Sequence, residues 1–448
     1  MPYRRRALWA LVILACVLLL IAPALWNGFA LLQYDTGGYL APWYEGRLEV
    51  NRPVPYGLLL VAGQRPDFWP VVIVQAALTV WLLALILRAH GLKDRPWLLF
   101  GTVATLCLFT TLPWLTAILL TDIFAGLGVL ALYLLLLRDE ALRRGERAGL
   151  MALTIYCAAT HSGTFILLAG LVAVGALVRL IERARIPLAR LTRAVAALAL
   201  SAIVVFMLDG AVTGRAAWPP GGYALSFGRM LQDGIVRKYL DDHCPDPALQ
   251  LCPYRAALPR DPDQFFWGGG VFDKLGRFSG LHDEMRRIAL ASLADYPLLQ
   301  LKSVAAGTAE QLMLVETGAG VVNWIWNTYD TIKAHAPGAV PAMLAARQQR
   351  GALPFDAINR LQVPAAFLTM ALLPVIVLLA WRRPRFADIG EFAVFAGLAI
   401  LGNAAVFGLF ATAHNRYGAR VVWLAALALI LALVRLAKER LGKAAELP

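Results

Sequence analysis

"ALWALVILACVLLLIAPALWNGFALL", residues 7–32, is an apolar run long enough to decide the fold class. It exceeds the roughly 18 apolar residues that predict a transmembrane helix. Ala22-Pro23-Ala24 has the form of a signal-peptide cleavage site, but the run is longer than the apolar region of a signal peptide, which has about 7–15 residues. We therefore predict an uncleaved first span with a cytoplasmic N-terminus.

Further apolar runs follow along the 448-residue chain, of which 16% is charged, against about 25% in soluble proteins. We predict an all-α polytopic membrane protein with about ten transmembrane helices. The expected helices are 7–32, 69–88, 97–113, 115–137, 149–160, 164–181, 194–213, 362–381, 389–411 and 420–436. The run 149–160 is too short to cross about 30 Å of hydrocarbon alone, so we expect it to form a short hairpin with 164–181.

Basic residues set the predicted orientation, because cytoplasmic loops carry an excess of Lys and Arg. With ten spans, the basic connections all fall on one face, which is then cytoplasmic together with both termini. These connections contain Arg4–Arg6, Arg88–Arg95, Arg138–Arg147, Arg183–Arg190, Arg382–Arg385 and Lys438–Lys443. The same excess explains the net charge of +13, and no nucleic-acid partner is inferred from it.

The pattern divides the chain into three parts. Residues 1–213 form an N-terminal transmembrane core with the first periplasmic loop, 214–361 a periplasmic and mainly helical domain, and 362–448 the C-terminal transmembrane helices. Cys16, Cys107 and Cys157 lie in apolar runs, whereas Cys244 and Cys252 flank a short loop on the non-cytoplasmic side. We predict a disulfide between these two, since that compartment is oxidising; two free thiols are the alternative, and a zinc site lacks an evident fourth ligand.

Ionisable residues gather at the outer ends of the predicted spans, while the span interiors are nearly free of charge. The outer group is Asp35, Arg52, Asp122, His161, His414, Arg416 and Arg420. Singly, each has an ordinary structural explanation, such as a helix cap or a head-group anchor. An ion-coupled transporter needs ionisable residues near the midplane, a pattern that this sequence lacks.

The order of the motifs resembles the GT-C superfamily of integral membrane glycosyltransferases, which use polyprenyl-phosphate-linked sugars. The motifs are "YDTGGYL" after the first span, "NRPVPYG" in the same loop, "LLTDIFAG" opening a later span, "THSGT" in the hairpin and "HNRYGAR" before the last span. The resemblance covers residues 1–185 best. "DTGG" has no second carboxylate beside Asp35, where many members of the family have one, which favours a metal-independent member.

The resemblance implies that Asp35 is the catalytic base, which takes a proton from the acceptor hydroxyl. Arginine suits the donor phosphate because its planar fork pairs with two oxygens. The expected substrate-binding residues are Tyr39, Arg52, Asp122, His161, His414, Arg416, Tyr417 and Arg420. The implied enzyme is an inverting transferase of the bacterial inner membrane that needs no cofactor. It acts on the periplasmic face on a polyprenyl-phosphate sugar and a glycan, lipid or protein acceptor.

Two other classes of function remain. The chain is alternatively a transporter or lipid flippase, or an envelope acyltransferase that uses outer-face histidines. Sugar transfer in detergent, where no gradient exists, would distinguish an enzyme from a transporter or flippase. An acyltransferase would be favoured if His161→Ala abolished activity while Asp35→Asn left it intact.

Overall fold

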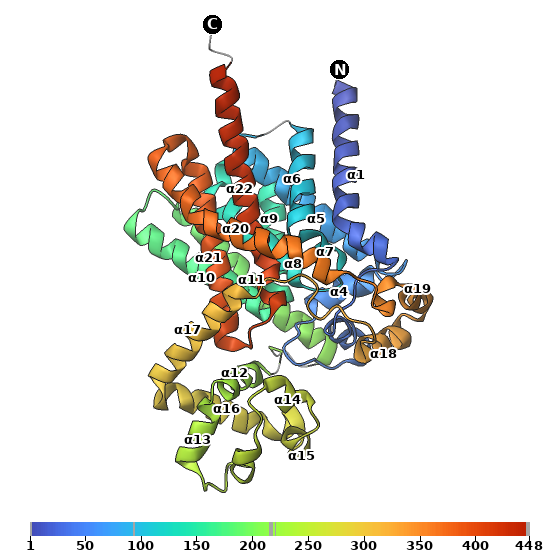
Figure 1. Ribbon diagram of the computed structural model, residues 1–448, viewed down its shortest axis with the longest axis vertical. Helices are drawn as coiled ribbons and strands as arrows, with labels where there is room; N and C mark the ends of the chain where they lie inside the picture. Colours follow the sequence, from blue (N-terminus) through green and yellow to red (C-terminus); the bar gives the residue numbers. More distant parts are fainter. Residues whose placement is uncertain (1, 93–94, 215–217, 220, 445–448) are drawn as a thin grey trace.

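The computed structural model describes residues 2–92, 95–214, 218–219 and 221–444, and α-helices account for most of this part (Figure 1). Within it, seven helices are long and apolar enough to cross a membrane, as a multi-pass membrane protein requires. They are α1 (Pro2–Asn27), α5 (Trp69–Ala89), α10 (Ser162–Ile181), α11 (Leu188–Thr213), α20 (Phe355–Arg382), α21 (Ala387–Phe410) and α22 (Asn415–Ala444).

Two more apolar helices, α6 (Pro96–Phe109) and α8 (Asp122–Leu137), and the less apolar α9 (Arg144–Thr160) are shorter. With a rise of 1.5 Å per residue they are about 21–26 Å long, less than the thickness of the hydrocarbon core. We expected a helix over residues 149–160, but α9 begins earlier, at Arg144. Glu146 accepts a hydrogen bond from the backbone N–H of Arg143 and pairs with Arg88, so the polar first turn is held in the helix.

The expected span 115–137 is wrong at its N-terminal end, and so is the C-terminal end of the expected span 7–32. α7 (Leu112–Ala117) is a separate short helix, and α8 begins only at Asp122. Residues 29–32 follow α1 in non-helical form. Leu31 N donates to Ala117 O and Leu119 N donates to Leu31 O, each at 2.9 Å. Strand-like pairing satisfies these backbone groups inside an apolar core, a solution that hydropathy cannot distinguish from a helix.

The loop between α1 and α5 contains α2 (Thr36–Leu40), α3 (Pro42–Glu45) and α4 (Pro55–Ala62). α18 (Trp326–His335) packs on α2, and α19 (Val340–Ala345) follows α18 in the chain. Thr328 accepts a hydrogen bond from Gly37 N and donates to Gln33 O, both 3.0 Å. Gln348 exchanges hydrogen bonds with both backbone groups of Leu32. Residues near 320–350 therefore pack into the main core together with the first loop.

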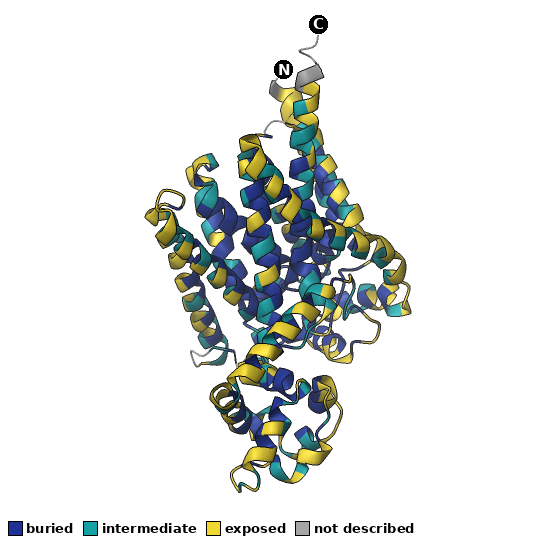
Figure 2. Ribbon diagram, turned by 60° about the vertical axis from the view of Figure 1, so that its left-hand side comes forward, coloured by how far each residue is buried: buried dark blue, intermediate teal, exposed yellow. Residues whose placement is uncertain are grey.

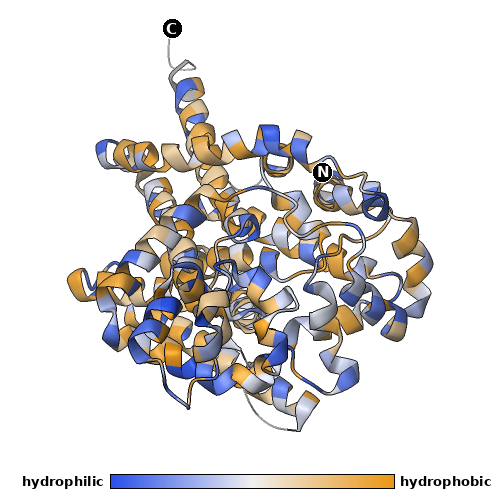
Figure 3. Cartoon of the chain, turned by 60° about the horizontal axis from the view of Figure 1, so that its bottom comes forward, coloured by the Kyte–Doolittle hydropathy of each residue, from blue (hydrophilic) through white to orange (hydrophobic). Residues whose placement is uncertain are grey.

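A separate lobe is formed by α12 (Gly222–Gln232), α13 (Ile235–His243), α14 (Pro262–Trp267), α15 (Val271–Lys274) and α16 (Arg277–Asp295). It has a hydrophobic core of its own, which includes Phe227, Phe265 and Phe272. Figure 2 shows buried positions inside both the lobe and the bundle, and Figure 3, turned to bring the lobe end forward, shows hydrophilic residues on the helices there. α17 (Pro297–Met313) runs from the lobe to the bundle and packs along α21. Within residues 221–361, the lobe and residues 321–346 thus belong to two different hydrophobic cores.

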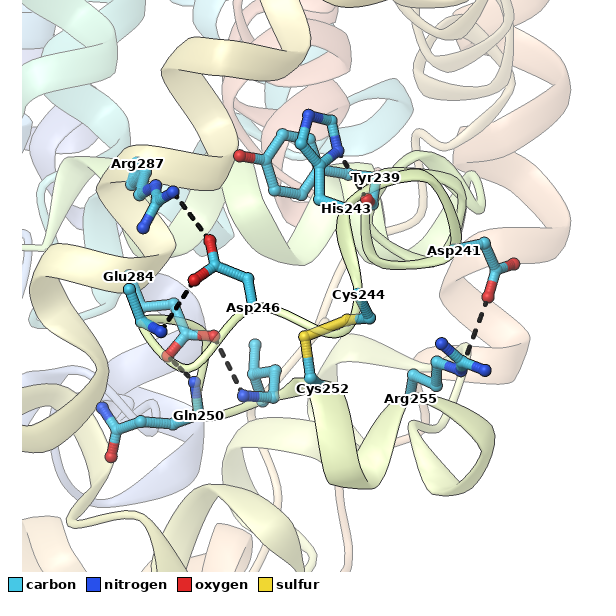
Figure 4. The surroundings of a disulfide bond; sticks show 12 residues. Tyr239, Asp241, His243, Cys244, Asp246, Gln250, Cys252, Arg255, Glu284 and Arg287 are labelled. Carbon is cyan, nitrogen blue, oxygen red and sulfur yellow. Dashed lines mark hydrogen bonds and ion pairs between the residues drawn. A yellow bond between two sulfur atoms is a disulfide. The ribbon is translucent and has the colours of Figure 1, made fainter.

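Cys244 and Cys252 form a disulfide that closes the loop after α13, as the sequence suggested (Figure 4). Glu284 of α16 supports the same loop, since its carboxylate accepts hydrogen bonds from the backbone N–H groups of Gln250 and Leu251. Five 3-10 helices complete the described elements: Asp139–Ala141, Cys252–Ala257, Pro337–Ala339, Arg347–Arg350 and Pro384–Phe386.

The two ends of the bundle differ in their side chains. α1 begins and α22 ends at one end, and the lobe lies at the other (Figure 1). Ion pairs tie the predicted basic connections together at the first end, which we call the terminal end. They are Arg88–Glu146, Arg138–Glu391, Arg185–Glu391 and Arg435–Asp388. α22 starts with Asn415 at the opposite end, where the candidate site lies.

Candidate functional site

Four segments bring charged side chains together at the start of α22. Asp35 precedes α2, Arg52 lies on the turn before Pro53, Asp122 is the first residue of α8, and Arg416 lies in the first turn of α22. Arg416 Nη1 is 2.6 Å from Asp35 Oδ2, and Arg416 Nε is 2.7 Å from Asp122 Oδ2. Asp35 Oδ1 in turn accepts from Arg52 Nη2. The side chains form one chain of ion pairs in the order Arg52, Asp35, Arg416, Asp122.

Arg420 lies one helical turn beyond Arg416 and therefore shares its face of α22. Its side chain is fully buried, its Nε donates to Asn403 Oδ1 at 2.9 Å, and its Nη1 lies 4.0 Å from Asp122 Oδ1. Both Nη atoms of Arg420, and Oδ1 of Asp122, have no hydrogen-bond partner among the described residues. Unpaired polar atoms of this kind are costly to bury, so they mark a place where a polar ligand gains binding energy.

The charges of the cluster do not balance. Three guanidinium groups, those of Arg52, Arg416 and Arg420, face two carboxylates, those of Asp35 and Asp122. The side chains of Asp122 and Arg420 are almost wholly buried, and that of Arg416 is 11% exposed, so solvent screens this surplus weakly. The cluster carries one net positive charge and favours an anionic ligand.

The two arginines beside Asp35 determine its protonation state. Burial alone would raise the pKa of this carboxyl, but the guanidinium groups of Arg52 and Arg416 outweigh burial and hold the pKa well below its usual range. Asp35 is therefore ionised at neutral pH while both arginines contact it. A carboxylate in this state accepts protons weakly until one of its cationic partners is drawn away.

His161 joins the cluster from the turn between α9 and α10. Its Nδ1 accepts a hydrogen bond from Gly163 N at 3.0 Å, so in the neutral ring the proton is on Nε2. Burial, together with the positive charges of Arg420 and Arg416, lowers the pKa of His161 well below its usual value. His161 is thus neutral, with a proton on Nε2 that it can donate, and it lies within the electrostatic influence of both arginines.

The other predicted residues lie at different distances from this centre. Tyr39 is buried and its hydroxyl is 3.3 Å from Thr121 Oγ1; burial raises its pKa to about 12. Tyr417 stacks on Phe407 with ring centroids 3.7 Å apart, and the Arg416 guanidinium lies 5.5 Å from the Tyr417 ring. His414 is exposed, and its ring hydrogen-bonds Thr412.

Glycines explain how the cluster can be so compact. A Cβ on Gly38 would lie 2.8 Å from Cδ of Arg52, and one on Gly37 would lie 2.8 Å from Cα of Thr328. Both distances are too short for real contacts. The two glycines of "DTGG" therefore make room for the Arg52 side chain and for α18.

Asp209 is a positioning residue to which the sequence analysis gave no role. It is fully buried in α11, and its Oδ1 accepts a hydrogen bond from Val54 N at 3.2 Å. Trp43 Nε1 donates to the carbonyl oxygen of Val54 at 2.8 Å. Together they fix the turn that carries Arg52. An isolated acid in an apolar helix is a recognisable signal of a functional position, but its partner was not predictable.

No family model, curated protein or solved structure matches this chain. Across the described ranges, no group of three or more His, Cys, Asp or Glu side chains is placed to hold a metal ion. The charged cluster is therefore the basis for the function proposed below.

Proposed function

We propose that this protein is an integral membrane glycosyltransferase of the GT-C type. It moves a sugar from a polyprenyl-phosphate donor to a cell-envelope glycan, lipid or protein. The observation that carries the proposal is the bridge that Arg416 forms to Asp35 and Asp122, residues 381 and 294 positions away in the sequence. A carboxylate held beside surplus guanidinium groups combines a base with a phosphate-binding site.

The proposed topology has ten spans, in which α6, α8 and α9 join the seven longer helices. Both termini are cytoplasmic in a bacterial inner membrane, and the charged cluster and the lobe lie on the periplasmic side. The clustering of the basic connections at the terminal end supports this orientation. So does the disulfide in the lobe, which suits an oxidising compartment.

The donor phosphate competes with the carboxylates for the arginines. Asp35 and Asp122 already occupy Arg416, so an entering phosphate must take over some of its hydrogen bonds. Arg416 and Arg420 can accept it, because the Nη atoms of Arg420 are unpartnered and arginine binds phosphate with two parallel bonds. His161 Nε2–H is a further, uncharged donor. Fixed donors of this kind stabilise the charge that develops on the leaving group.

Loss of its cationic partners raises the proton affinity of Asp35 at the moment when a base is needed. In the proposed reaction the acceptor hydroxyl attacks the anomeric carbon, and its proton passes to Asp35. The bond between that carbon and the phosphate oxygen breaks, and the polyprenyl phosphate leaves with the electron pair. One displacement inverts the anomeric configuration. In this mechanism the chain's own cations stabilise the phosphate, and no metal ion is required.

Transfer measured with purified protein in detergent tests the proposal. The protein is incubated with polyprenyl-phosphate sugars and envelope acceptors, and the release of polyprenyl phosphate is followed. A transporter or flippase would show no turnover without a membrane. An acyltransferase would lose activity on His161→Ala and keep it on Asp35→Asn, whereas a glycosyltransferase of the proposed kind depends on Asp35.

A further inference from the structure

An apolar groove lies on the outside of the bundle, along α20 and α21. Two cavities of about 440 and 550 Å³ adjoin one another and share the side chains of Val377, Trp381, Val394 and Leu398. α21 packs against both α10 and α20. Side chains of α10, α20 and α21 line the first cavity together with Leu136 and Leu137 of α8, and side chains of α20 and α21 line the second. The residues that line the two cavities are apolar except Arg185 and Glu391.

The groove belongs to helices that are long and apolar enough to cross a membrane. The groove is open to its surroundings, since Val394 and Leu401 of α21 are 45% and 50% exposed. A concave apolar surface at this depth faces hydrocarbon, so a hydrocarbon chain fills it without loss of hydrogen bonds. A hydrocarbon chain therefore fits the apolar part of the groove.

The end of the groove near the termini is basic. Arg185 Nη2 lies 3.2 Å from Glu391 Oε1, while the other oxygen of Glu391 pairs with Arg138 at 2.7 Å, and Arg185 also lies 3.4 Å from Glu182. The two connections that border this end, residues 182–187 and 383–386, contain four arginines and one glutamate. Trp381, 81% exposed, stands beside them, as aromatic residues do at membrane interfaces.

We propose that this groove binds one anionic phospholipid, with its phosphate head group at Arg185 and one acyl chain along α20 and α21. The basic connections supply charge complementarity to the lipid phosphate. The two adjoining cavities form a continuous apolar surface for the acyl chain. The head-group end of the lipid site lies at the terminal end of the bundle, opposite the end that holds Asp35. It does not depend on the proposed sugar transfer.

Two glycines allow the groove to be filled without disturbing the backbone. A Cβ on Gly175 would lie 3.6 Å from Ile186 Cδ1, and one on Gly397 would lie 3.8 Å from Leu373 Cδ1, both ordinary contacts. Gly175→Phe fills the first cavity and Gly397→Phe the second. Gly170→Phe is the matched control, because Gly170 lies on α10, has an exposed position and has nothing within 4 Å of its would-be Cβ.

Native mass spectrometry of the full chain, released from nanodiscs of phosphatidylglycerol mixed with phosphatidylcholine, reads out the bound lipid. We expect wild type and Gly170→Phe to retain one phosphatidylglycerol with at least about tenfold preference, a difference of 1.4 kcal/mol. Gly175→Phe and Gly397→Phe should lose this lipid, and Arg185→Gln should lose the preference while still retaining a lipid. If one of the two phenylalanine variants fails to fold, the other still tests whether filling the groove removes the lipid.

Three results would overturn the proposal: equal retention of both phospholipids by wild type, retention of phosphatidylglycerol by the filled variants, or displacement of phosphatidylglycerol by equimolar polyprenyl phosphate. The last would assign the groove to an isoprenoid lipid instead.

Discussion

Nη1 of Arg416 lies 2.6 Å from Oδ2 of Asp35, although one residue follows the first long helix and the other opens the last. The same guanidinium reaches Asp122 with its Nε. The bridge holds three distant segments together and sets the charge of the proposed base. Most of the chemical predictions concern what happens when this bridge is altered.

Arg416→Lys should lower kcat by about 100-fold, because lysine cannot bond two partners with one planar fork, and loss of one fixed donor to a developing anion costs about that much. Steady-state transfer assays measure the effect. Arg435→Lys, at the terminal end of the same helix, is the control and should leave kcat unchanged. Equal kcat for Arg416→Lys and wild type would remove this arginine from the proposed chemistry.

Arg52→Gln should move the acid limb of the pH profile of kcat/KM upward. Arg52 helps to hold the pKa of Asp35 below its usual range, so its removal raises that pKa, and the base becomes protonated at a higher pH. An opposite charge at this distance is worth about 1–3 pH units. Arg47→Gln serves as control, since Arg47 lies in the same loop but its side chain is 65% exposed and pairs with Glu45 and Glu49.

The same pairing predicts how folding stability depends on pH. A carboxyl whose pKa is depressed in the folded state adds stability above its unfolded pKa, which is about 3.9 for aspartate, and loses it as the pH falls. Wild type should therefore lose more stability between pH 5 and pH 3 than Asp35→Asn does, as measured by thermal unfolding in detergent. A constant difference between the two proteins across this range would mean that Asp35 is not paired with cations in solution.

Asp209→Ala should destabilise the turn that carries Arg52, since it leaves the buried N–H of Val54 without an acceptor. A group left unpaired in this way costs about 1–3 kcal/mol. Asp209→Asn retains an acceptor oxygen and should restore both the midpoint of thermal unfolding and kcat. If asparagine and alanine behaved alike, the charge of Asp209, and not its hydrogen bond, would be what matters.

Gly38→Ala should impair catalysis although it adds only one methyl group, because that group would lie 2.8 Å from Cδ of Arg52. Arg52 must then leave its place beside Asp35, so we expect the same upward shift of the acid limb as in Arg52→Gln. Gly170→Ala, at an open position, should have no effect on the profile. An unshifted profile for Gly38→Ala would show that the loop adjusts without moving Arg52.

Much of the bundle could be predicted because long apolar runs have few alternatives to a helix. The pairing of Asp35 with Arg416 could be anticipated because the arginine-rich connections place both residues at the same end of the spans. The break between α7 and α8 could not be predicted, since the buried bridge of Ile118 to Leu31 and the turn that follows it have the same hydropathy as a helix. The packing of Thr328 on Gly37, and the bond from Val54 to Asp209, join residues far apart in sequence, and no local pattern reports such contacts.

Sugar transfer by Asp35→Asn, assayed in detergent with a polyprenyl-phosphate donor, tests the central claim most directly. Asp330→Asn is the matched control, because its side chain is 68% exposed and lies outside the cluster. The account predicts that Asp35→Asn folds and binds the donor but loses at least about 100-fold in kcat, while Asp330→Asn turns over like wild type. Undiminished kcat in Asp35→Asn would contradict the role of this carboxylate as the base.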